Sequence, residues 1–119
     1  MNLKEVAVQW VKSTVLNDYI AYGDVAAAIE TIDGNVYTGI SIDTAYSLGH
    51  CAEHSAVSEM LKHGEYRIKA VVAVDSMGNA VPPCGRCREL MSQLSPDNSE
   101  AIVEVHNGIF KTLEELNTF

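Results

Sequence analysis

Two apolar runs most constrain the fold of this chain. Residues 25–32 and residues 68–74 are apolar at nearly every position, so each predicts a strand that is buried on both faces of its sheet. Such strands need other elements packed above and below them. The remaining segments should therefore include helices that cover a sheet from both sides.

Helical periodicity in the sequence predicts the helices that would form those covering layers. Apolar residues recur at three- and four-residue spacing in three segments, which we predict to be amphipathic helices: residues 2–17, 52–63 and 85–94. Further strands, joined by Asp-Gly and Asn-Gly turns, are predicted at residues 36–42, 101–105 and 109–112, and a short helical turn at 113–116. The order α-β-β-α-β-α-β-β predicts an α/β protein, a three-layer sandwich around a mixed sheet.

Composition narrows the class of protein. With 119 residues, 47% of them hydrophobic, the chain can bury one core, which predicts a single domain over residues 1–119. A net charge of -8 argues against binding nucleic acid, because a phosphate backbone requires clustered Lys and Arg. The sequence shows neither an apolar run near the roughly 20 residues of a membrane span nor the pattern of a secretion signal. We therefore expect a soluble, cytoplasmic protein that binds neither nucleic acid nor membranes.

All three cysteines stand at predicted helix starts. Cys51 precedes the second helix, and Cys84 and Cys87 open the third. A two-residue gap lets one turn present two thiolates to one metal, and the free N–H groups of a helix N-terminus stabilise thiolates. Three protein ligands on Zn²⁺ leave a fourth position for water, which is the arrangement of a catalytic site. Glu53, on the first turn after Cys51, is placed to reach that water without binding the metal.

Plainer interpretations of these residues stay open at this point. The cysteines could form a structural metal site or be free core thiols, and Glu53 could be a helix N-terminal acid stabilised by the helix dipole. His50, His54, His63 and His106 are interpreted as surface, helix-end or supporting residues rather than ligands. A closed structural site would need a fourth ligand, which the pattern lacks. The cysteine, one residue, an acid, and then a distant Pro-Cys-x-x-Cys together favour the zinc deaminase arrangement.

Residues 51–54 (CAEH) and 83–88 (PCGRCR) resemble the zinc-dependent cytidine deaminases, including the blasticidin-S deaminase branch. The resemblance runs over nearly the whole chain. It implies a three-layer α/β/α sandwich with a five-stranded mixed sheet, assembled as a homotetramer. It also implies one zinc ion per subunit, bound by Cys51, Cys84 and Cys87, with Glu53 as the catalytic proton shuttle.

The resemblance further implies a reaction: hydrolysis of a free aminopyrimidine nucleoside, cytidine or deoxycytidine, to uridine or deoxyuridine and ammonia, as in pyrimidine salvage. Glu53 would take a proton from water, pass it to N3 of the pyrimidine and then protonate the leaving amine. Within the same chemistry, the alternative substrate is blasticidin S or another amino-heterocycle. A structural zinc module is the non-enzymatic alternative.

The substrate-binding residues depart from the usual family pattern. Ser41 and Asp43 stand where typical members have the ribose-binding Asn-x-Glu, and with Ala52 they form the expected substrate-binding set. The plainer interpretation of Ser41 and Asp43 is two polar residues at a strand end. His54 stands where many members have an arginine. We expect Arg86, between the two ligand cysteines, to offset the negative charge of the thiolates instead, with His54 beside it.

Overall fold

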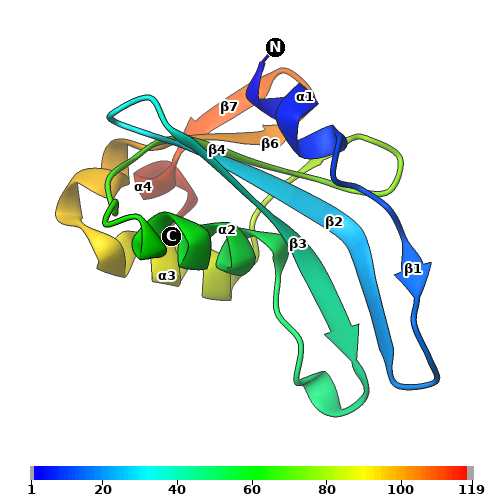
Figure 1. Cartoon of the computed structure of the whole chain (residues 1–119). Coiled ribbons are helices and arrows are strands. Elements are labelled where there is room, and N and C mark those ends of the chain that lie inside the picture. The colour runs from blue at the N-terminus through cyan, green and yellow to red at the C-terminus, as the bar shows by residue number, and fades with distance from the viewer. Residues whose placement is uncertain (1, 118–119) are drawn as a thin grey trace.

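The computed structural model describes residues 2–117. It contains a mixed sheet with helices on both faces (Figure 1). In chain order the elements are α1 (Leu3–Val8), β1 (Thr14–Val15), β2 (Ile20–Thr31), β3 (Val36–Thr44), the 3-10 helix η1 (Ala45–Ser47), α2 (Ala52–Lys62), β4 (Ile68–Val74), β5 (Ala80–Val81), α3 (Gly85–Leu94), the 3-10 helix η2 (Pro96–Glu100), β6 (Ile102–His106), β7 (Ile109–Thr112) and α4 (Leu113–Leu116).

Five long strands lie side by side in the order β3-β2-β4-β6-β7. Strand β4 runs parallel to β6, whereas β2 pairs antiparallel with both β3 and β4, and β6 antiparallel with β7. The predicted mixed sheet is therefore confirmed. The expected count of five was too low for residues 2–117, because the two-residue strands β1 and β5 pair with the ends of β2 and β4. Such short pairings carry no periodicity that a sequence pattern could show.

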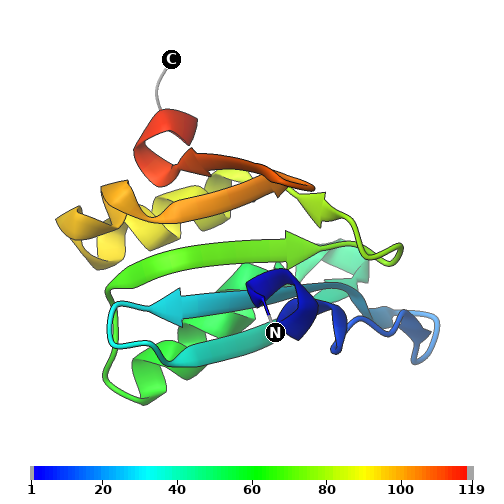
Figure 2. The ribbon, with the colours of Figure 1, turned by 90° about the horizontal axis from the view of Figure 1, so that it is seen from above.

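The two central strands are buried on both faces, as their composition predicts. One face of β2 and β4 packs against α2 and α3, and its core includes Ile29, Met60, Val71 and Met91. The opposite face packs against α1 through small residues such as Ala26. Figure 2 shows α1 alone on its side of the sheet, with α2 and α3 behind it. The three-layer α/β/α sandwich is thus confirmed.

The predicted helix over residues 2–17 was wrong beyond Val8. The chain leaves the helix there and crosses to β2, where the backbone N–H of Lys12 donates to the carbonyl of Gly23 at 3.0 Å. Gly23 has a φ of +80°, and a Cβ at this position would lie 2.3 Å from the Lys12 carbonyl oxygen. β-branched residues such as Thr14 fit the resulting strand β1 better than a helix. The long-range pairing with β2 overrides the helical apolar stripe.

Gly39 in β3 sets the distance between the sheet and α2. A Cβ on Gly39 would lie 2.4 Å from the backbone nitrogen of Ala56 and 2.5 Å from the carbonyl oxygen of Ala52. Both of those atoms belong to α2. We predict that Gly39→Ala lowers the free energy of unfolding by about 1–3 kcal/mol, because the helix must move away from the sheet. Denaturant unfolding measures this loss.

The matched control for this prediction is Gly85→Ala, since a Cβ on Gly85 meets only the Arg88 side chain, at 3.6 Å. That variant should keep the wild-type stability or gain a few tenths of a kcal/mol from the better helix propensity of alanine. Equal stability of the Gly39 and Gly85 variants would contradict the close approach of α2.

Candidate active site

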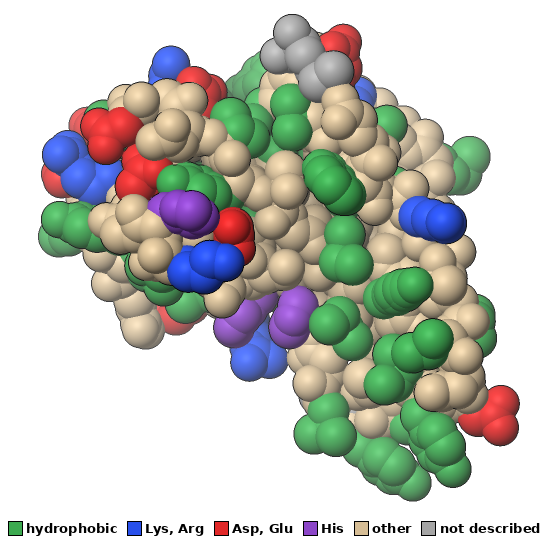
Figure 3. Space-filling view, in the orientation of Figure 1, with side chains coloured by type: hydrophobic (Ala, Val, Ile, Leu, Met, Phe, Trp, Pro, Cys, Tyr) green, Lys and Arg blue, Asp and Glu red, His purple; other side chains and the backbone are tan. Residues whose placement is uncertain are grey.

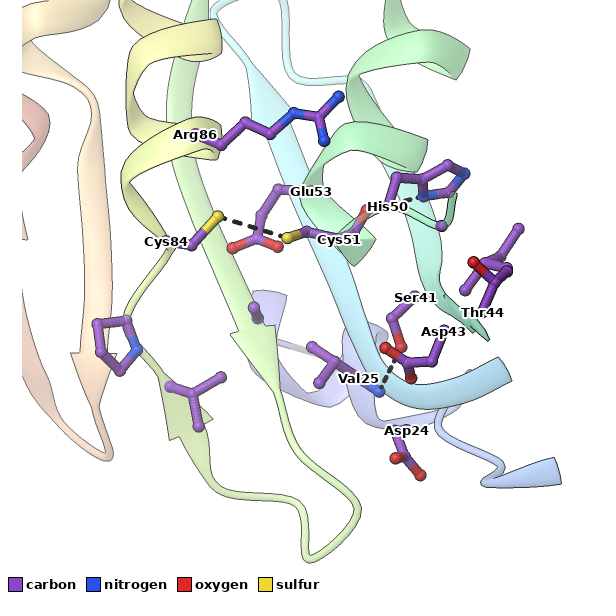
Figure 4. Close-up of a pocket in the computed structure, with 15 residues that line it drawn as sticks. Asp24, Val25, Ser41, Asp43, Thr44, His50, Cys51, Glu53, Cys84 and Arg86 are labelled. Atoms are coloured by element: carbon purple, nitrogen blue, oxygen red, sulfur yellow. Dashed lines mark hydrogen bonds between the residues drawn. The ribbon is translucent and has the colours of Figure 1, made fainter. Parts of the chain in front are cut away.

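The three thiols come from the N-termini of two neighbouring helices. Cys51 is the N-cap residue of α2, Cys84 is the N-cap residue of α3, and Cys87 lies buried in the first turn of α3. Their three Sγ atoms lie within 4.8 Å of one another, with 3.4 Å between those of Cys51 and Cys84. Figure 4 shows the Cys51 and Cys84 sulfurs facing each other from the two helices. The predicted convergence of the cysteines is what the fold produces.

This sulfur cluster has the dimensions of a zinc site. Tetrahedral zinc with Zn–S bonds of about 2.3 Å holds two sulfurs about 3.8 Å apart, which is close to the observed spacing. Thiolates are also ligands that favour zinc over hard cations. Within residues 2–117 no fourth His, Cys, Asp or Glu joins the group. The donor set therefore fits Zn²⁺ with one position left for a small molecule such as water.

The helix N-termini and burial act on the thiols in opposite directions. Burial works against ionisation of Cys84, but hydrogen bonds outweigh it and lower the pKa of the Cys84 thiol: the backbone N–H of Cys87 acts most strongly, followed by the Cys51 and Cys87 thiols and the backbone N–H of Arg86. Burial raises the pKa of Cys87 well above its ordinary value. Because a metal binds thiolates, metal binding at this cluster must release protons and must become weaker as the pH falls.

Glu53 is a buried carboxyl group beside the sulfurs. It lies on the first turn of α2, its side chain is only 4% exposed, and Figure 4 shows it on the same side of the cavity as Cys51 and Cys84. Burial raises the pKa of Glu53, because a charged carboxylate loses its hydration there. A carboxyl group that gains and loses a proton easily is suited to general acid–base chemistry.

A cavity of about 560 Å³ opens from these groups towards the ends of β2 and β3. Its volume lies in the usual range of small-molecule sites. Besides the Cys51 and Cys84 thiols, seven polar side chains line it: Asp24, Ser41, Asp43, Thr44, His50, Glu53 and Arg86. The cavity therefore joins the sulfur cluster and Glu53 to a polar wall formed by the sheet.

The predicted substrate-binding residues separate into two groups. Ser41 and Asp43 both line the cavity; Ser41 is buried, and its hydroxyl oxygen accepts the backbone N–H of Val25 at 3.1 Å. Ala52 is fully buried against Ala27 and is not among the residues that line the cavity.

The two predicted supporting residues lie at the rim of the sulfur cluster. Arg86 lines the cavity from the first turn of α3. His54 stacks on His50 with ring centroids 5.6 Å apart, and burial, together with Arg86 and His50, lowers its pKa. His54 is thus neutral near pH 7, and Arg86 is the positive charge at this end of the cavity.

Sequence reasoning missed Asp24 as a cavity residue. The pattern placed it in a break before the strand, but β2 continues through it with a register shift between Tyr22 and Ala26. A bulge of this kind redirects side chains, and its position depends on pairing with β3 rather than on local sequence. The adjacent glycine, Gly23, was the only local signal.

Comparison with known proteins identifies the family. The model of the cytidine and deoxycytidylate deaminase zinc-binding region matches residues 4–103. The chain belongs to this family. The resemblance inferred from residues 51–54 and 83–88 is thereby confirmed.

Individual relatives agree with this assignment. A cytidine deaminase of Halalkalibacterium halodurans is 35% identical over 85 residues, which cover 69% of this chain and 64% of the relative. The chain thus matches slightly less than two thirds of that relative's length. A blasticidin-S deaminase of Bacillus cereus is 34% identical over 98% of this chain and 87% of the relative. The crystal structure of cytidine deaminase from Mycobacterium leprae superposes with a TM-score of 0.79 at 30% identity, covering 96% of this chain and 92% of that one.

Among the described residues, the longest helices are too short and too polar to span a bilayer.

Removal of one sulfur tests the metal site. We predict that wild-type protein binds about one zinc per chain and that Cys87→Ala weakens zinc binding more than 100-fold, since loss of even an outer partner costs roughly 10- to 100-fold. Competition with a chromogenic chelator measures the affinity. Glu53→Gln is the control, because it keeps all three thiols and should keep the zinc. Tight one-to-one zinc binding by the Cys87 variant would contradict this assignment.

Proposed function

We propose that this chain is a zinc-dependent hydrolase that deaminates free cytidine or deoxycytidine to the uridine nucleoside and ammonia. The observation that carries this proposal is the buried carboxyl group of Glu53 beside three convergent thiols at the end of a nucleoside-sized cavity. Membership of the deaminase family, and the similarity to the cytidine deaminase of Halalkalibacterium halodurans, support the same reaction.

Cys51, Cys84 and Cys87 would hold the metal. When bound there, zinc would supply the chemistry of an activated water, a nucleophile available at neutral pH. Three thiolates and Zn²⁺ sum to a charge of -1, which weakens this effect. Arg86 supplies a compensating positive charge from between the two α3 cysteines, and it is close enough to His54 to help lower the pKa of that imidazole.

Glu53 carries the proton. It accepts one from the attacking water and donates it to N3 of the pyrimidine, which makes C4 electrophilic. As the C4–O bond forms, Glu53 takes up the second proton and delivers it to the exocyclic amine, so that the C4–N bond breaks and ammonia leaves. The raised pKa of Glu53 suits this role, because the carboxyl group must hold a proton between the two transfers.

The wall of the cavity would bind the sugar. Ser41 keeps its hydroxyl proton available, since its oxygen accepts from Val25, and Asp43 offers carboxylate oxygens that accept hydrogen bonds from sugar hydroxyls. The third predicted contact, Ala52, is fully buried and does not line the cavity, so we assign it no contact with the substrate. A modified cytosine nucleoside such as blasticidin S is the second candidate substrate, because the blasticidin-S deaminase relative matches 98% of this chain.

The assembly and compartment belong to the same proposal. We infer a homo-oligomer, a tetramer by the family resemblance, in which residues 1–119 act as one domain. Exposed apolar side chains gather where the β1–β2 turn meets η1, visible at the lower right of Figure 3: Val15, Leu16, Tyr19, Tyr46 and Leu48. A single species near 12.9 kDa in sedimentation velocity would contradict the oligomer.

Three reduced thiols suit the cytoplasm, whose thiol pools keep cysteines from pairing.

Replacement of the proton carrier tests the reaction. We predict that Glu53→Gln lowers kcat on cytidine by about 100- to 10,000-fold, because proton transfer through a positioned group contributes that much. Ultraviolet absorbance follows the loss of cytidine, deoxycytidine and blasticidin S. Zinc content and circular dichroism should stay at wild-type values. A zinc-loaded wild-type protein that leaves all three compounds unchanged would contradict the proposed function.

Removal of the positive charge tests Arg86. We predict that Arg86→Ala keeps one zinc per chain but lowers kcat about tenfold, because loss of a partner that tunes a metal site costs roughly 10- to 100-fold. Arg67→Ala is the control, since Arg67 is an exposed arginine that pairs with Asp97 and does not line this cavity. Unchanged turnover with full zinc content in the Arg86 variant would show that the thiolates need no such compensation.

A further inference from the structure

The side chain of Arg88 occupies an unfavourable position in α3. Its Nε is buried, and within residues 2–117 it is the buried side-chain nitrogen or oxygen atom that has no hydrogen-bond partner. A buried donor without a partner is destabilising, and a positive charge near the start of a helix opposes the helix dipole. Arg88 combines both features at the end of the first turn of α3. Such a residue needs an explanation in what its other atoms hold.

The guanidinium group of Arg88 joins α4 to the start of α3. Its Nη1 donates to the carbonyl of Leu116 in α4 at 3.0 Å. Its Nη2 lies 3.6 Å from the place of a Cβ on Gly85, so the guanidinium lies over the first residue of α3. The backbone N–H of Arg88 donates to the carbonyl of Cys84 at 3.0 Å. Arg88 therefore contacts both ends of the turn that carries Cys84 and Cys87.

The core holds α4 in place independently of Arg88. Leu113 is buried in the core that α3 also covers, and its backbone N–H donates to the carbonyl of Ala101 at 2.9 Å. A capping box closes the N-terminus of α4. Beyond this helix, the side-chain amide of Asn117 donates to the hydroxyl of Ser92 in α3 at 2.9 Å. Because α4 is fixed in this way, its contact with Arg88 also fixes the start of α3.

The first turn of α3 determines the spacing of two sulfurs. Cys84 is its N-cap residue, and the backbone N–H of Cys87 donates to the Cys84 Sγ at 3.4 Å. Between them stand Gly85, which has no side chain and a poor helix propensity, and Arg86, which is exposed. Neither residue packs against the core to hold the turn. Metal affinity depends on groups that fix the ligands in their binding geometry, so whatever holds this turn acts on the metal site.

We propose that Arg88 is a positioning residue of the zinc site: it ties the first turn of α3 to α4 and thereby holds the Cys84 and Cys87 sulfurs at the spacing that zinc requires. This role explains why a cation with an unpaired Nε lies near a helix N-terminus. The proposal rests on the zinc site of the proposed function but not on the identity of the substrate. It makes α4 part of the scaffold of the metal site, although no residue of α4 lines the cavity.

The plainer interpretation is that Arg88 only adds to the overall stability of the fold. The two interpretations differ in what they predict for protein that is fully folded. A positioning role predicts weaker zinc binding and a looser first turn of α3, whereas a purely structural role changes neither.

Replacement of the guanidinium group tests the proposal. Arg88→Met keeps a long unbranched side chain and should raise the Kd of zinc about tenfold, the lower end of the loss when a partner of a metal ligand is removed. Arg88→Lys keeps a positive charge and a donor for the Leu116 carbonyl, so it should recover part of the affinity. Chelator competition measures each Kd under conditions in which circular dichroism shows folded protein.

Arg67→Met is the matched control, because Arg67 is an exposed arginine that pairs with Asp97. It should bind zinc as tightly as the wild type. Wild-type zinc affinity in Arg88→Met overturns the proposal.

Two core variants separate positioning from a general loss of stability. Leu113 and Val103 are both 1% exposed in the same core, but Leu113 anchors α4 and Val103 lies in β6. Both Leu113→Ala and Val103→Ala should lower the free energy of unfolding, yet only Leu113→Ala should raise the Kd of zinc. A Kd raised as much by Val103→Ala as by Arg88→Met overturns the proposal, and the Arg88 variants decide by themselves if Leu113→Ala does not fold.

Amide hydrogen exchange of the zinc-free protein gives a readout that needs no metal. In Arg88→Met the amides of residues 87 and 88 should exchange faster, because their hydrogen bonds to Cys84 close the first turn of α3, while the amides of α2 should keep their rates. Unchanged exchange over residues 85–88 overturns the proposal. A wild-type protein that binds no zinc would contradict the proposed function, and the exchange rates would still decide whether Arg88 holds the turn.

Discussion

Close packing of α2 and α3 on one face of the sheet places every reactive group of this protein. The two central strands are apolar on both faces, so that helices must cover them, and Gly39 lets the backbone of α2 approach β3 directly. Since Cys51 and Cys84 cap these helices, the packing that buries Met60 and Met91 also brings the thiols together. The arrangement of reactive groups at the N-termini of α2 and α3 therefore depends on how these helices pack on the sheet.

Neighbouring groups in this site have environments that favour opposite protonation states. Helix N–H groups favour the thiolate of Cys84, whereas burial favours the protonated form of Glu53 a short distance away. Such a site needs sulfurs that are ionised to bind the metal and, at the same pH, a carboxyl group that can both take up and release a proton. The cavity adds a third environment, in which the exposed side chains of Asp24 and Asp43 meet water.

Strong periodicity made most elements predictable from the sequence. The strand over residues 68–74 and the helix over residues 85–94 have the predicted bounds, because the strand is a nearly continuous apolar run and the helix has one apolar face. Prediction was wrong for residues 9–17, where an apolar stripe continued but the chain turned away to pair with β2. Asp24 was missed for a related reason, since a register shift in β2 is decided by the partner strand.

The sequence by itself determined the donor set. Three cysteines, one acid at a fixed offset and an arginine between two of the cysteines specify which atoms are available for zinc and proton chemistry, because their spacing along two helix starts is local. Only the tertiary structure decided that Glu53 is buried, that Ala52 is fully buried rather than lining the cavity, and that Asp24 lines it as well as Asp43. Burial and juxtaposition depend on which strands pair and which helices cover them. The local pattern of a single segment cannot predict such long-range contacts.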